Sequence, residues 1–153
     1  MSTKTSEFQT LTLESNDKSK TADIRGGTYS IDYYEDIFSP TITAKIIVMD
    51  TGGSIPDKNG EPSTIYNGLP LRGGERVLIK ISGNSGTNAG LDFTEDVNDY
   101  FYVASITNVL LDESTESFTL NLVSRVAITN ETMSVGKKFP TSEKISNSVI
   151  ICF

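Results

Sequence analysis

The chain has 153 residues, a length typical of one domain, and its 20 acidic and 13 basic residues leave a formal charge of −7. Without histidine and with a single cysteine, Cys152, it cannot form a histidine-based catalytic triad, a Cys/His metal site or an internal disulfide. The negative charge argues against binding nucleic acid by neutralising phosphates. The polar N-terminus and the absence of long apolar runs predict neither a signal peptide nor a membrane span. We therefore expect synthesis in the cytoplasm, no membrane binding, no cofactor and no bound metal.

The first part of the chain is predicted to be only loosely attached. Residues 1–21 are mostly polar and contain one short alternating run at 8–13, which predicts a mobile segment with a loosely held strand. From residue 22 the alternation tightens. Ile31 and Tyr33 follow the pair Gly26-Gly27, which predicts a strand with a bulge or bend.

The middle of the chain alternates between strands and loops. Apolar residues at every second position predict half-buried strands over 41–49 and 75–81. Between them, residues 50–74 are rich in glycine and proline and are predicted to lie outside the core. Residues 99–111 and 116–125 form a predicted hairpin, with Phe118, Leu120 and Leu122 facing inward.

Short helices are predicted only near the end. Residues 126–133 suit a single helical turn, and 140–153 suit the start of an amphipathic helix with Ile145, Val149 and Cys152 on one side. Its apolar residues suggest either a shortened larger protein or a partner that covers them. The fold class is thus mainly β over 22–139, with long inter-strand loops and one or two short helices.

Carboxylate clusters are the remaining catalytic candidates: Glu35 and Asp36; Asp92, Glu95 and Asp96; Asp112 and Glu113. Each lies in a predicted loop or turn, where acidic residues are expected for local hydrogen bonding and solvation. The run Asp92–Asp96 also lacks the spacing and the glycine of an EF-hand calcium loop. We therefore expect no enzyme; a carboxylate-based glycosidase is the enzymatic alternative.

Two further motifs have an ordinary structural interpretation. Residues 71–75 contain two glycines, but no Lys-Ser/Thr follows as in a phosphate-binding loop. The aromatic residues Tyr29, Tyr33, Tyr34 and Phe38 have acidic neighbours, which favours core packing or a protein interface over base stacking. The alternative is a carbohydrate- or receptor-binding β-sandwich that stacks sugars on Tyr33, Tyr34 and Tyr66.

A series of segments gives a more specific indication. In chain order they are Tyr29–Pro40, Asp50–Gly53, Gly68–Val77, Tyr102–Val109, Glu116–Ser124, Ala127–Glu131 and Lys137–Pro140. Their succession, over about residues 22–150, resembles the baseplate hub subunit of contractile-tailed bacteriophages (myoviruses). The resemblance depends on structural segments and not on a catalytic signature.

The resemblance implies a tail-tube-like domain, an antiparallel β-barrel or sandwich, in a non-enzymatic virion protein. Such domains form a three- or six-fold ring with copies of themselves or with homologous hub domains. The ring connects the tail-tube protein to the spike, next to the wedge proteins of the baseplate, and DNA passes through its lumen without specific binding. The chain is then either a single-domain version or a shortened or split hub, located in the virion after assembly in the host cytoplasm. Residues 50–74 become an inter-subunit arm.

Two sets of site residues follow from this interpretation. The subunit interface is predicted to include Tyr33, Tyr34, Phe38, Arg72, Ile145 and Val149. Negative charge suits a lumen through which DNA slides, because like charges keep phosphates from sticking. The acidic residues predicted to face the lumen are Asp92, Glu95, Glu113 and Glu116.

Overall fold

The computed structural model describes residues 5–53, 55–57, 59–85, 87–96, 99–112, 115–134, 136, 138, 140, 142 and 144. It is mainly β, as predicted. The strands are β1 (Phe8–Glu14), β2 (Thr21–Asp23), β3 (Thr28–Tyr34), β4 (Thr43–Asp50), β5 (Ile55–Pro56), β6 (Pro62–Ser63), β7 (Arg76–Ile81), β8 (Leu91–Phe93), β9 (Phe101–Leu111) and β10 (Glu116–Ser124). The helices are the 3-10 turn η1 (Arg25–Gly27), α1 (Ile65–Gly68) and α2 (Arg125–Thr132).

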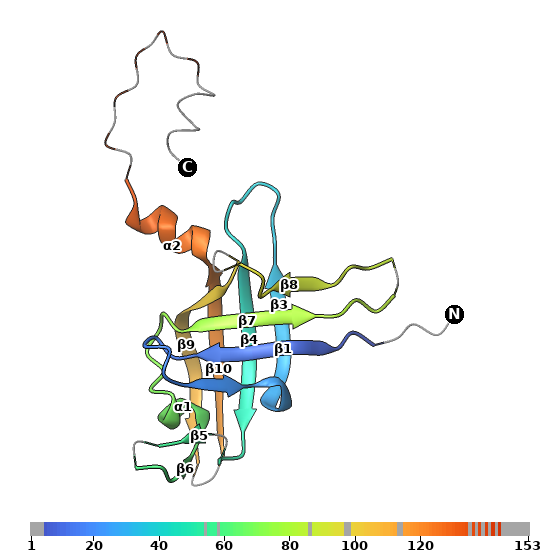
Figure 1. The fold of residues 1–153 in the computed structure, drawn as a ribbon, viewed down its shortest axis with the longest axis vertical. Helices are drawn as coiled ribbons and strands as arrows, with labels where there is room; N and C mark the ends of the chain where they lie inside the picture. The colour runs from blue at the N-terminus through green and yellow to red at the C-terminus, as the bar shows by residue number, and fades with distance from the viewer. Residues whose placement is uncertain are drawn as a thin grey trace.

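One curled antiparallel sheet makes up most of the molecule. Its strand order is β2-β1-β7-β9-β10-β4-β3, with β8 paired to β7, while β5 and β6 form a separate small hairpin. In Figure 1, β1, β2, β7 and β8 run across β3, β4, β9 and β10 at a steep angle. The sheet therefore forms two crossed layers, a half-barrel with the core between them.

The two layers meet where β7 changes partner. Arg76 and Val77 pair with the start of β9, whereas Ile79–Ile81 pair with β8. On the β9 side, the N–H of Val103 donates to the carbonyl of Glu75 at 2.9 Å, and the N–H of Gly74 donates to the carbonyl of Val103 at 2.7 Å. Beyond Val103, β9 pairs only with β10 within the described residues.

The core confirms the predicted alternation. Every second residue of β4, and of β10 from Glu116 to Leu122, is buried, because successive side chains of a strand point to opposite faces; Thr119 on the other face of β10 is buried as well. The buried hydrophobic residues are Leu11, Leu13, Ala22, Ile24, Ala44, Ile46, Val48, Ile55, Ile65, Leu69, Leu71, Val77, Ile79, Phe101, Val103, Phe118, Leu120 and Leu122.

Two expectations about the core are wrong. The first strand is not loosely held, because β1 pairs with β2 and β7 on its two sides and buries Leu11 and Leu13 completely. The segment 50–74 is not outside the core. It folds back through β5, β6 and α1 and buries Ile55 and Ile65, because four of its apolar residues cover the end of the half-barrel.

The chain bends at the glycine pair Gly26-Gly27 before β3, as predicted. The turn η1 ends at Gly27, where an added Cβ would lie 2.3 Å from the carbonyl oxygen of Met49, so only glycine allows β3 to approach β4 so closely. A register shift between Thr28 and Ser30 follows. Tyr29 is consequently exposed, whereas Ile31 packs on the core.

The predicted single turn at 126–133 is the two-turn helix α2, which projects beyond the end of β10 (Figure 1). Ile145 and Val149, and with them most of the predicted helix at 140–153, lie outside the described residues. None of the described helices has the length and apolar character needed to cross a membrane.

Candidate functional site

The open stretch of β9 is the first candidate, because it presents both backbone and apolar side chains. No strand covers the outer side of Ala104–Leu111 within the described chain. Ile106 and Val109 pack against the core, but Leu110 and Leu111 are 70% and 57% exposed. An uncovered strand edge with exposed leucines can add a strand from another chain.

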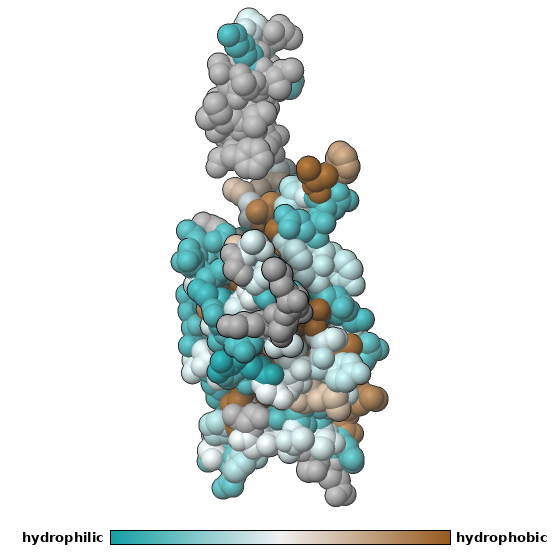
Figure 2. Space-filling model, turned by 90° about the vertical axis from the view of Figure 1, so that its right-hand side faces the viewer, coloured by the Kyte–Doolittle hydropathy of each residue, from teal (hydrophilic) through white to brown (hydrophobic). Residues whose placement is uncertain are grey.

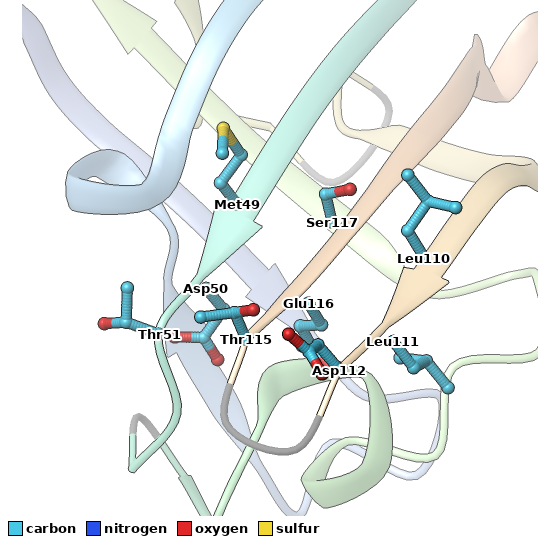
Figure 3. A pocket seen from close by; sticks show the side chains of 9 residues that line it. All are labelled: Met49, Asp50, Thr51, Leu110, Leu111, Asp112, Thr115, Glu116 and Ser117. Atoms are coloured by element: carbon cyan, nitrogen blue, oxygen red, sulfur yellow. The ribbon is translucent and has the colours of Figure 1, made fainter.

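A pocket of about 290 Å³ lies beside this edge, at the β9–β10 turn (Figure 3). Met49, Leu110 and Leu111 form its apolar part, while Asp50 and Glu116 line it near α1. We did not predict the exposed leucines from the sequence. The sequence did contain an indication of an exposed leucine, because two consecutive leucines of a strand point to opposite faces and cannot both face the core.

The opposite edge of the same layer is β3. No described strand pairs with its outer side. Tyr34 near its end is exposed, and the turn to β4 carries Ile37 and Phe38, which are 92% and 94% exposed. Figure 2 shows that hydrophobic side chains on the face in view are few and separate, and that some project near the upper end of the molecule. The exposure of Tyr34 and Phe38 is compatible with the predicted interface, which stays a prediction.

Tyr33 has a different environment from its neighbours. It packs against Phe93 with ring centroids 5.8 Å apart, and its hydroxyl donates to Glu35 Oε2 at 2.8 Å. Partial burial, together with this carboxylate, raises the pKa of Tyr33 to about 12. Tyr33 is therefore mainly a packing residue that links β3 to β8.

The predicted sugar-stacking set is not brought together. Tyr33 and Tyr34 lie beside Ala44 and Thr43 at the start of β4. Tyr66 lies on α1, next to the opposite end of β4, and its ring packs on Phe118 at 5.9 Å. The alternative of a carbohydrate platform made of these tyrosines is not supported, because β4 separates its members.

Glu75 is a buried acid whose two carboxylate oxygens both accept hydrogen bonds. It is almost fully buried, and Oε1 accepts the N–H of Arg72 at 2.7 Å while Oε2 accepts the N–H of Gly73 at 2.8 Å. Asn16 Nδ2 donates to Oε1 at 3.3 Å. This carboxylate orders the turn that leads into β7. The side chain of Arg72 itself is exposed, as an interface residue requires.

Two other buried acids, Asp50 and Glu116, face each other across β4 and β10. The prediction that Glu116 faces a lumen is wrong, because its side chain is only 3% exposed and turns inward at the first residue of β10. The burial of both acids depends on the folded-back segment 50–74, and no pattern in the sequence indicates it.

Of the other predicted lumen residues, Asp92 and Glu95 are on the surface. Asp92 forms an ion pair with Lys80 across β7 and β8, and this hydrogen bond, with a second from Thr94, lowers the pKa of Asp92. Glu95 is exposed, and Glu113 lies outside the described residues. In the part of the chain that the structure describes, no three His, Cys, Asp or Glu side chains are grouped as in a metal site.

Comparisons with protein-family models, with curated proteins and with solved structures found no match.

Proposed function

We propose that this chain is a non-enzymatic structural protein of a contractile phage tail, which assembles through its strand edges into a baseplate ring between tail tube and spike. The observation that carries the proposal is the four-stranded layer β9-β10-β4-β3, whose two outer strands both have an uncovered edge within the described residues. A lone β domain has to protect such edges, and neighbouring copies in a ring do so. The sequence resemblance supplies the identity of the ring.

The strand directions suit a ring. Neighbouring strands in this layer are all antiparallel, so with four strands β9 and β3 run in opposite directions. A rotation about an axis parallel to the strands keeps their directions. It therefore places β3 of the next copy antiparallel to β9, and the sheet continues without a change of pattern. Such a contact joins two different surfaces, as closed rings require.

The charge suits a channel for DNA. β9 and β10 contain no lysine or arginine, and the whole chain carries a formal charge of −7. On the outer face of these strands, Asn121 Nδ2 donates to the hydroxyls of Ser105 and Thr107 at 3.2 and 3.1 Å. Lys45 of the neighbouring strand β4 pairs with Asn121, so β9 and β10 carry no cation of their own but have one beside them. A wall with little positive charge lets phosphates pass, because it gives them little counter-charge.

The test is the oligomeric state in solution and on electron micrographs. We expect native mass spectrometry and negative-stain images of the purified chain, alone or with tail-tube and spike proteins, to show a three- or six-fold ring. The double variant Leu110→Lys, Leu111→Lys puts two charges on the open edge and should abolish the ring. Val126→Lys, Met133→Lys adds the same charge to an exposed position of α2 and to the exposed residue that follows the helix, and should leave the ring intact.

A chain that stays monomeric with every tail component contradicts the proposal. Rings that form equally well in both double variants show that the β9 edge is not the contact.

A further inference from the structure

Asp50 and Glu116 form a pair of buried acidic residues at the end of the β4–β10 ladder. The two residues are directly opposite each other in the β4–β10 ladder and are 7% and 3% exposed. Two carboxylates so close together and so little solvated repel each other, and burial of each is costly without a compensating charge.

The hydrogen bonds of the pair come mainly from the segment that folds back over it. The N–H of Ile65 donates to Asp50 Oδ2 at 2.9 Å, and the N–H of Gly52 donates to Oδ1 at 3.2 Å. Glu116 Oε1 accepts the N–H of Tyr66 at 2.7 Å. These donors position the two carboxylates beside α1.

None of these hydrogen bonds involves the second carboxylate oxygen of Glu116, Oε2. It is buried and has no hydrogen-bond partner, the only such side-chain atom among the described residues. No lysine or arginine of the described chain forms an ion pair with Glu116. The contrast with Glu75 is direct, because both oxygens of that buried carboxylate accept hydrogen bonds. A buried carboxylate oxygen without a protein partner is a place where a water molecule or a cation can bind.

The pocket beside the pair has the chemistry and the space for one. Its volume is about 290 Å³, and Thr51, Asp112 and Thr115 add further oxygen atoms to its wall (Figure 3). A water molecule takes about 30 Å³, so the pocket accommodates an ion with several waters. Oxygen ligands in an irregular arrangement suit Ca²⁺, whereas Mg²⁺ requires a nearly ideal octahedron.

We propose that Asp50 and Glu116 bind one Ca²⁺ ion, with water completing its ligand shell, and that the ion fastens α1 to the β4–β10 end of the half-barrel. Two carboxylates instead of three or more place the dissociation constant at about 0.1–1 mM, the range of weak calcium sites. The site is formed within one chain, so it does not depend on the proposed ring. It departs from our sequence-based expectation that the protein binds no metal.

The first experiment measures thermal unfolding of the full chain in 10 mM CaCl₂ and in EDTA. For the natural sequence we expect Ca²⁺ to raise Tm by about 3–6 °C, the shift for a site of about 1 mM in a domain of this size. Glu116→Gln keeps the size of the side chain and an acceptor for the Tyr66 N–H but removes the charge. It should unfold at the same Tm with and without Ca²⁺.

Glu95→Gln is the matched control, because it removes one exposed acidic charge and should keep the full calcium response. An equal rise in Tm for the natural chain and Glu116→Gln overturns the proposal, and so does the absence of any rise in the natural chain. A rise of the same size in 10 mM MgCl₂ overturns the assignment to Ca²⁺.

The second experiment uses Tb³⁺, which replaces Ca²⁺ and emits when a nearby tyrosine absorbs light. Because the backbone of Tyr66 contacts Glu116, we expect sensitised emission that Ca²⁺ displaces and that Glu116→Gln loses. Tyr66→Phe should lose most of the emission and keep the calcium-dependent rise in Tm. Emission that persists in Glu116→Gln places the ion elsewhere and contradicts the proposal.

Discussion

The two parts of β9 have the same strand partner on one side but different environments on the other. Phe101 and Val103 lie between β10 and β7 and are buried. From Ala104 to Leu111 the strand has β10 on one side only, and its last two leucines are exposed. The two environments show that different parts of one strand can have different roles. Its closed part holds the crossed layers together, while its open part is available to another molecule.

The largest effect is expected in the closed part, from Phe101→Ala. The Phe101 ring lies in the core with its centroid 5.0 Å from that of Phe93, so its removal leaves a cavity where the layers meet. We expect a loss of about 3–5 kcal/mol in the free energy of unfolding, measured with urea. A loss below about 1 kcal/mol would mean that this junction does not hold the layers together.

Glu75→Ala should have the next largest effect, because it acts on the same junction. It leaves the N–H groups of Arg72 and Gly73 without their acceptor, beside the backbone contact between Glu75 and Val103. We expect a loss of about 2–4 kcal/mol in unfolding free energy, the size of hydrogen bonds to a charged group. Glu75→Gln keeps one acceptor and should lose less. Equal losses would show that the charge has no part in the effect.

A smaller effect is expected in the turn between β1 and β2, where the contribution of Asp17 to the free energy of unfolding depends on pH. Hydrogen bonds from the Ser19 side chain, the Ser19 N–H and the Ser15 hydroxyl lower the pKa of Asp17 from 3.8 to about 2. A lowered pKa in the folded state stabilises the protein above the unfolded value, and this contribution disappears as the pH falls from about 4 to 2.

Urea unfolding of the natural chain and of Asp17→Asn at several pH values in this range measures the contribution. The natural chain should lose stability more steeply than the variant as the pH falls. A carboxyl titration of Asp17 by NMR with a midpoint near 4 would contradict the assigned hydrogen bonds.

The smallest effect is expected in the open part of β9, from Leu111→Ala. The leucine is more than half exposed, so its truncation should change the unfolding free energy by less than about 0.5 kcal/mol. The same variant should weaken ring formation if the edge is a contact. A loss of several kcal/mol would mean that Leu111 belongs to the core, and the contrast between the two parts of β9 would fail.

Much of the strand pattern could be predicted from the sequence, because it depends on local alternation. In β10, Phe118, Leu120 and Leu122 alternate with polar residues, and this alternation places the three apolar side chains together on the core face. The helical turn after β10 was expected as well, although α2 is longer than a single turn. Composition misled us at residues 50–74, because glycine and proline hid the apolar residues that fold back over the core.

The candidate sites were predictable only in part. The exposed side chains of Tyr34 and Phe38 follow from their acidic, turn-rich surroundings. The burial of Glu116 does not, because its neighbours in sequence indicate only a hairpin turn. Its environment comes from Tyr66, 50 positions away in the chain.

By itself, then, the sequence determined the longer strands, and in β4, β7 and β10 which face is apolar, since both depend on spacing along the backbone. The tertiary structure alone decided where β7 leaves β9, which edges remain open and which carboxylates are buried together. Those features depend on contacts between segments far apart in the chain, and periodicity carries no information about such contacts.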